Sequence, residues 1–149
     1  MPASTAPLHV AYKYQKNAAG VGFDWPTIDG VWDKLHEELD ELREADGGGS
    51  RDAVEAELGD LLFAAVNLAR WLKVQPDMAL RKANVRFRDR FHLVERTYRE
   101  QGRRMQDADI DELESAWQAA KAELAAHSAA EAKVVPEAPE APEDQGDRS

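Results

Sequence analysis

The chain has 149 residues, of which 43% are hydrophobic and 32% are charged, a balance that allows one globular core. Its formal charge of −10 argues against nucleic-acid partners, whose phosphates it would repel. The lack of cysteine excludes disulfides and thiolate metal sites and suits a cytoplasmic setting. We recognise neither a signal peptide nor an apolar run long enough to span a membrane, so we expect no membrane partner.

Apolar residues recur with a helical period throughout the body of the chain, and no segment alternates as a β-strand does. The pattern predicts an all-α bundle of about five helices. They are expected at residues 8–19, from about 27 to 46, from about 51 to 73, 76–101, and from about 109 to 127. Ser50 is the expected N-cap of the third helix, Pro76 belongs to the first turn of the fourth, and Asp109 or Asp111 opens the fifth.

Three segments follow from this pattern. We expect residues 1–7 to be a flexible N-terminus, 8–127 a single helical domain, and 128–149 a disordered acidic tail rich in Pro, Ala and Glu. The tail has no aromatic residue and almost no core-forming residue, so it cannot bury enough apolar surface to offset the entropy of ordering.

Two pairs of acids border the apolar stripes of the second and third helices. At about 100° per residue, Glu38 and Glu41 lie along one flank of the stripe centred on Leu35. On the third helix, Glu57 and Asp60 lie on a flank of the stripe centred on Leu58, which also includes Val54, Leu61, Leu62, Ala65, Ala69 and Leu72. In an antiparallel hairpin of these helices, both acidic pairs converge.

Carboxylates brought together beside a core repel one another and resist desolvation. A hard divalent cation removes this conflict, and Mg²⁺ prefers oxygen ligands. The pairs are therefore interpreted as metal ligands. The alternative is that they are solvated surface acids, because the chain contains 29 acidic residues and Glu favours helices.

The fourth helix carries a basic flank. Asn84 and Arg90 border its apolar arc, and Arg86 precedes Arg90 by one helical turn. A guanidinium can grip phosphate oxygens through its planar fork, although a solvated basic face is the simpler interpretation. On the fifth helix, Trp117 aligns with core positions and stands one turn before Lys121; core packing and stacking on a base are both open.

Five segments in order resemble the MazG family of nucleoside triphosphate pyrophosphohydrolases: YKYQKNAAGVGFDW, KLHEELDEL, ELGDLLFAAVNLARWL, ALRKANVRFRDRF and ESAWQAAK. They cover about residues 10 to 125. The resemblance implies an all-α protein, a homodimer or a dimer of dimers, that uses Mg²⁺, with Mn²⁺ as a substitute, to split nucleoside triphosphates into NMP and pyrophosphate. A role in cleansing the nucleotide pool is implied as well.

The same resemblance assigns roles to particular residues. It implies that the metal ligands are Glu38, Glu41, Glu57 and Asp60, that the phosphate contacts are Arg86 and Arg90, and that the nucleotide pocket includes Lys34, Trp117 and Lys121. We add Asn84 to the nucleotide-binding candidates. For the catalytic base we favour Glu38, acting through the metal, with Glu37 as the alternative; the sequence does not choose between them.

The chain departs from the family at two positions of the fourth helix. A lysine is common where Arg86 stands, and a basic residue is common where Asp89 stands. Two rival functions stay open at this point: a related pyrophosphohydrolase acting on dUTP or phosphoribosyl-ATP, and a non-enzymatic helical interaction module.

Overall fold

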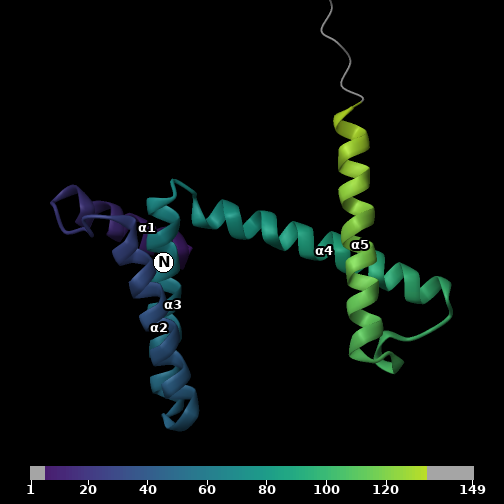
Figure 1. Ribbon diagram of the computed structural model, residues 1–149, viewed down its shortest axis with the longest axis horizontal. Coiled ribbons are helices and arrows are strands. Elements are labelled where there is room, and N and C mark those ends of the chain that lie inside the picture. Colours follow the sequence, from purple (N-terminus) through teal and green to yellow (C-terminus); the bar gives the residue numbers. More distant parts are fainter. Residues whose placement is uncertain (1–5, 134–149) are drawn as a thin grey trace, which may run out of the picture. The chain divides into compact units, whose positions relative to one another are not determined.

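The computed structural model of the protein describes residues 6–133. These residues contain helices and no strand, which confirms the predicted all-α class (Figure 1). In chain order the elements are α1 (Pro7–Gly20), α2 (Ile28–Gly48), α3 (Arg51–Trp71), α4 (Pro76–Glu100), the 3₁₀ helix η1 (Met105–Asp107) and α5 (Ile110–Ala132). The chain divides into two compact units, Met1–Val85 and Arg86–Ser149, with the boundary inside α4, whereas the sequence predicted a single domain.

Polar side chains cap two helices at the predicted places. Ser50 accepts a hydrogen bond from the backbone N–H of Ala53 at 3.2 Å and begins α3. At the start of α5, Asp109 accepts from the backbone N–H of Glu112, and the Glu112 side chain accepts from the backbone N–H of Asp109. This reciprocal capping box selects Asp109 over Asp111 as the N-cap.

Helix α5 continues to Ala132, so the prediction that a disordered tail starts at residue 128 is wrong for residues 128–132. The segment SAAEA supplies three alanines and a glutamate, which are strong helix formers and extend a helix that is already nucleated. The rest of the predicted tail, residues 134–149, and most of the predicted flexible N-terminus, residues 1–5, lie outside the described residues.

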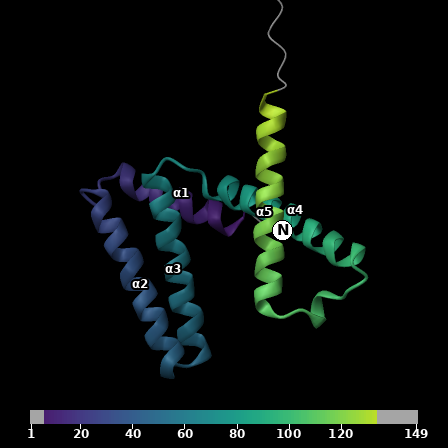
Figure 2. The same cartoon turned by 45° about the vertical axis from the view of Figure 1, so that its right-hand side comes forward.

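In the first unit, α2 and α3 form an antiparallel hairpin and α1 packs against α3 (Figure 2). Val31 of α2 is fully buried, and Ala64 and Val66 of α3 are also buried. The link between α2 and α3 is only Gly49 and Ser50, so the two helices run side by side along their length. The hairpin therefore brings the acid-bearing flanks of both helices close together.

The apolar stripe of α3 that the sequence assigned to the core is partly exposed. Leu58, Leu62 and Leu72 are 45%, 52% and 50% exposed, whereas Ala64 and Val66 on other sides of the helix are buried. Helical periodicity identifies residues that share a face. It does not identify the face that a neighbouring helix covers.

In the second unit, α5 crosses α4. Val94 and Tyr98 of α4 and Ala120 of α5 form the buried centre of this crossing, and Leu93, Met105, Ala108, Leu113, Ala116 and Trp117 pack around it. Among the described residues, no helix is both long enough and apolar enough to span a lipid bilayer.

The capping box predicts a measurable loss on substitution. Asp109→Ala removes the acceptor for the Glu112 N–H and should lower the free energy of unfolding of the second unit by about 1 kcal/mol. Asp111→Ala, within the first turn but outside the box, is the control and should cost less. Thermal unfolding followed by circular dichroism measures both, and an equal effect of the two substitutions would contradict the capping role.

Candidate metal centre

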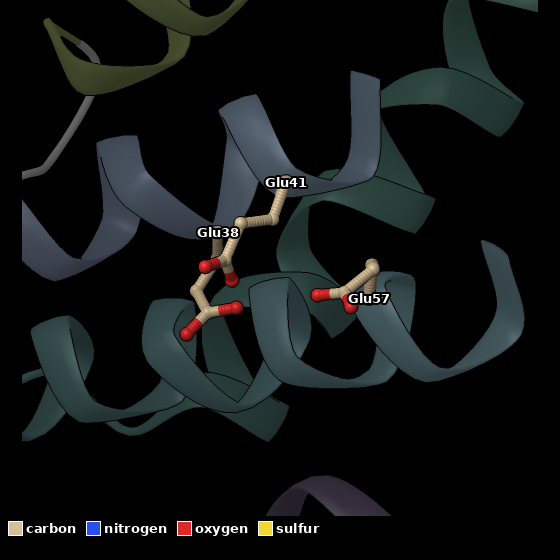
Figure 3. A group of neighbouring side chains, drawn as sticks. All are labelled: Glu38, Glu41 and Glu57. Atoms are coloured by element: carbon tan, nitrogen blue, oxygen red, sulfur yellow. The ribbon is translucent and has the colours of Figure 1, made fainter. Parts of the chain in front are cut away.

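Three carboxylates meet between α2 and α3. Ligand atoms from Glu38, Glu41 and Glu57 all lie within 4.8 Å of one another. Figure 3 shows Glu38 and Glu41 reaching from α2 toward Glu57 on α3. Glu38 is buried, with 5% of its surface exposed, and the other two are more exposed. The hairpin thus unites three of the four residues predicted as metal ligands.

The fourth predicted ligand, Asp60, lies one turn beyond Glu57 on α3 and is not part of this close group. It lines, together with Glu38, a cavity of about 720 Å³. The four predicted ligands therefore all lie at or beside one space, because Glu38 belongs both to the acidic group and to the cavity wall.

Lys34 partly neutralises the acidic group. Its Nζ lies 2.6 Å from Glu38 Oε1 and 3.1 Å from Glu37 Oε1. Hydrogen bonds to Glu38 and then to Glu37 raise the pKa of Lys34 above its ordinary value, so the ammonium stays charged at physiological pH. Glu38 Oε2, in contrast, has no hydrogen-bond partner among the described residues although it is buried.

The pKa of Glu41 responds to its position in the acidic group. Desolvation, followed by the negative charges of Glu38, Glu37 and Glu57, raises the pKa of the Glu41 carboxyl, and Lys34 only partly opposes this. The three clustered carboxylates and Glu37 share a single ammonium, that of Lys34, so negative charge is in excess. This excess, the unpaired Glu38 Oε2 and the all-oxygen donor set fit a hard metal cation.

The cavity beside the acids is built from α1, the 21–27 loop, α2 and α3. Its lining includes Tyr14 and Gln15 from α1, Phe23, Asp24 and Trp25 from the loop, Lys34 and Glu38 from α2, and Asp60, Phe63, Ala64, Asn67 and Arg70 from α3. Acidic groups thus share the wall with four aromatic residues, Tyr14, Phe23, Trp25 and Phe63. A ligand with a charged portion and a flat apolar portion suits such a cavity.

A network of polar contacts holds the loop against α3. Asp24 Oδ1 accepts hydrogen bonds from Arg70 Nη2, from Trp71 Nε1 at 3.3 Å and from the backbone N–H of Trp25 at 2.8 Å. Burial alone would raise the pKa of Asp24, but these donors and the charge of Arg70 outweigh it and lower that pKa. Arg70 is itself oriented by Asn67, whose Oδ1 accepts from Nε at 3.0 Å.

The remaining predicted site residues lie on α4 and α5. Asn84 lies on the part of α4 that belongs to the first unit, and it is exposed. In the second unit, the Arg90 guanidinium lies 5.8 Å from the centre of the Trp117 ring, which also packs against Phe87. Arg86 and Lys121 are exposed in that same unit. The core packing of Trp117 is observed, and the nucleotide-binding roles of these residues stay predictions.

The sequence analysis missed Gln15, Asp24 and Arg70 as residues that shape the cavity. Arg70 carried a usable signal, because it is the only charged residue in the apolar run LLFAAVNLARWL and needs an acidic partner. Its partner Asp24 is 46 residues away, so local periodicity could not identify the pair.

Comparison with known proteins agrees with this architecture. Residues 27–92 match the MazG nucleotide pyrophosphohydrolase domain. A nucleoside triphosphate pyrophosphohydrolase of Escherichia coli K12 is 44% identical over 127 residues, covering 81% of this chain and 47% of the relative. The nucleoside triphosphate pyrophosphohydrolase/pyrophosphatase MazG of Thermotoga maritima is 43% identical over 114 residues, covering 76% of this chain and 44% of the relative.

A further relative is the uncharacterized protein YabN of Bacillus subtilis, which is 41% identical over 68 residues, covering 46% of this chain and 14% of the relative. The chain thus spans about half the length of the E. coli and T. maritima relatives that it matches. The described residues of this chain are helical and contain no strand, as the all-α class requires. The chain contains a MazG domain over the matched residues 27–92, and these residues include the whole acidic group.

The raised pKa of Glu41 predicts the effect of removing its charge. A carboxyl whose folded-state pKa is raised destabilises the folded protein at pH values above that pKa, and the penalty disappears as the pH falls through it. Glu41→Gln should therefore raise the melting temperature of the metal-free protein at pH 7. The gain over the unsubstituted chain should shrink as the pH falls to about 4.

The control is Glu44→Gln, an exposed position outside the group, which should change the melting temperature little at either pH. Scanning calorimetry in the presence of a chelator measures both variants. A melting temperature of Glu41→Gln at or below that of the unsubstituted chain at neutral pH would show that the group is not electrostatically strained.

Proposed function

We propose that the protein hydrolyses nucleoside triphosphates to NMP and pyrophosphate in a Mg²⁺-dependent reaction, and that it serves to cleanse the nucleotide pool. The observation that carries this proposal is the group of Glu38, Glu41 and Glu57 at the edge of a cavity large enough for a nucleotide. The names of the E. coli and T. maritima relatives support the same activity.

In this proposal Glu38, Glu41, Glu57 and Asp60 hold the metal, and Mn²⁺ replaces Mg²⁺ with retention of activity. Carboxylate-bound Mg²⁺ neutralises phosphate charge and lowers the pKa of water. Glu38, buried and with one unpaired oxygen, is the favoured residue to orient the attacking water or accept its proton. Glu37 is the alternative, and its exposed carboxylate already contacts Lys34.

Residues outside the acidic group, most of them basic, are proposed to bind the phosphates and the rest of the nucleotide. Lys34 contacts Glu38 and Glu37, and its ammonium would be available to a phosphate oxygen if a bound cation took over the charge of Glu38. Arg86 and Arg90 are proposed to bind the phosphates, and Asn84, Trp117 and Lys121 to contact the nucleotide. Guanidinium groups suit this role because they match phosphate oxygens bidentately and stabilise charge that develops as the bond breaks.

Two alternatives are separated from this proposal by one assay. A pyrophosphohydrolase specific for dUTP or phosphoribosyl-ATP would share the acidic group and differ in the nucleotide that it accepts. A non-enzymatic helical interaction module would release no pyrophosphate from any nucleotide. Pyrophosphate release from a panel of NTPs, dNTPs and phosphoribosyl-ATP, with and without Mg²⁺, distinguishes the three.

The position of bond cleavage is the next prediction. We expect NMP and pyrophosphate as the primary products, because the similarity to nucleoside triphosphate pyrophosphohydrolases implies attack at the α-phosphorus. The sequence also contains no glycine-rich phosphate loop of the kind with which ATPases hold the β- and γ-phosphates. Hydrolysis in ¹⁸O-labelled water should place the label in NMP, as attack at the α-phosphorus requires. Accumulation of NDP, or label in orthophosphate, would refute this assignment.

The metal ligands are tested in the same assay. Glu38→Gln, Glu41→Gln, Glu57→Gln and Asp60→Asn should each keep the helical circular-dichroism spectrum and lose at least about a hundredfold in kcat/KM, because Mg²⁺ loses an anionic ligand. Glu44→Gln should retain activity. Turnover by the four variants at the rate of the unsubstituted protein would contradict the metal-site proposal.

We also propose that the protein is a homodimer or a dimer of dimers. The exposed Leu58 and Leu62 of α3 and Leu72, the C-cap of that helix, form an apolar stripe, and Val31 is the largest fully buried side chain among the described residues. A symmetric interface would remove this stripe from water. Light scattering at micromolar concentration should give at least twice the chain mass of 16.6 kDa, and Leu62→Glu should lower that mass. A monomer mass for the unsubstituted chain would contradict the proposal.

A further inference from the structure

Gln15 is a buried polar side chain in the wall of the cavity. It lies on α1, is only 7% exposed, and donates from Nε2 to the backbone carbonyl oxygen of Phe63 on α3 at 2.8 Å. This bond fixes the orientation of the amide, because a flipped amide would place two carbonyl oxygens against each other. The acceptor end, Oε1, is therefore the end left without a partner among the described residues.

An unpaired buried acceptor is unfavourable by about 1–3 kcal/mol. The mechanism proposed above does not use Gln15. A leucine or methionine could fill the same volume in the α1–α3 contact without leaving an oxygen unpaired. The amide thus suggests that a hydrogen-bond donor reaches Oε1 when the cavity is filled.

The surroundings of Gln15 indicate the shape of that donor-bearing group. Tyr14 and Phe23 are 67% and 83% exposed and both line the cavity, as does Phe63. Exposed aromatic rings in a cavity wall favour a flat, π-bonded ligand group. Glu38 and Asp60 line another part of the same cavity and are the proposed metal ligands. A nucleotide whose phosphates face those acids would have its base among the aromatic rings.

Contacts within the protein hold the 21–27 loop, which carries Phe23, in a fixed position against α2 and α3. Asp24 is bonded to Arg70 and Trp71 of α3, and the Trp25 ring lies so close to Gly30 of α2 that a Cβ there would meet Trp25 Cε3 at 2.6 Å. The loop is therefore fixed to both helices of the hairpin. A preorganised wall of this kind reduces the entropy lost when a ligand binds.

We propose that Gln15 is a specificity-determining residue that reads the base: an N–H group on the base edge donates a hydrogen bond to Gln15 Oε1. This inference rests on the proposed nucleotide substrate and goes beyond it, because it locates the base and names the group that recognises it. A nucleotide whose base lacks that N–H leaves Oε1 unpaired and binds more weakly.

The test compares matched nucleotides that differ in one donor. The pairs are ATP with purine riboside triphosphate, CTP with pyrimidin-2-one riboside triphosphate, and UTP with N3-methyluridine triphosphate. Dissociation constants are measured calorimetrically with Ca²⁺ in place of Mg²⁺ to slow turnover, and kcat/KM is measured with Mg²⁺. The unsubstituted protein should prefer the donor-bearing member of at least one pair about tenfold or more.

Two substitutions of Gln15 test whether this preference depends on its side-chain oxygen. Gln15→Met removes the acceptor and should bring the two members of that pair within about twofold of each other. Gln15→Glu keeps an acceptor oxygen while losing the N–H that binds Phe63, so it should retain the preference. Lys16→Met, the exposed neighbour on α1, is the matched control and should leave every ratio unchanged.

The outcomes separate this inference from the proposed function. No donor preference in the unsubstituted protein, or the same preference in Gln15→Met, overturns the role of Gln15 even if the protein hydrolyses NTPs. Equal loss of preference in Gln15→Met and Gln15→Glu would show that the amide only ties α1 to α3, and also overturns it. A Gln15-dependent preference in binding without pyrophosphate release would sustain the inference and refute the proposed activity.

Discussion

The repulsion among three carboxylates held between two packed helices is the constraint on which the rest of the first unit depends. Glu38, Glu41 and Glu57 are brought together because α2 and α3 form a hairpin with a two-residue link. Lys34 offsets only part of their charge, and desolvation together with the remaining negative charge raises the pKa of Glu41. Apolar packing along the hairpin must hold the acids together against this repulsion. A bound cation would convert the same arrangement from a cost into a gain in stability.

The cavity beside the acids is formed by contacts that cross the first unit. Asp24 fastens the loop to Arg70, the Trp25 ring packs on Gly30, and Gln15 ties α1 to the backbone of α3. Each contact joins an element that carries none of the proposed metal ligands to an element of the acidic hairpin. In the proposed function, alignment of a substrate would depend on α1 and the loop as well as on the acids, because α1 and the loop contribute Tyr14, Phe23 and Trp25 to the cavity that Glu38 and Asp60 also line.

Burial in the described chain is modest for a protein of this length. Val31 is the largest side chain that is fully buried among the described residues, while Leu58 and Leu62 of α3 and Leu72 at its C-cap are exposed. With so small a core, linkage to anything that binds only the folded state contributes a large share of the total stability. A cation in the acidic group, a nucleotide in the cavity and a second chain on α3 would all act in this direction.

The sequence by itself determined the helices, the cap at Ser50 and the flanks on which the acids lie, and it narrowed the N-cap of α5 to Asp109 or Asp111, because these features depend on residues within one or two turns of each other. Only the tertiary structure decided that Glu38, Glu41 and Glu57 converge while Asp60 lies along the cavity, since that depends on how two helices are rotated against each other. It also decided that Leu58 and Leu62 are exposed and that Gln15 meets Phe63 and Asp24 meets Arg70. Those partners are 48 and 46 residues apart, and helical periodicity carries no information over such a separation.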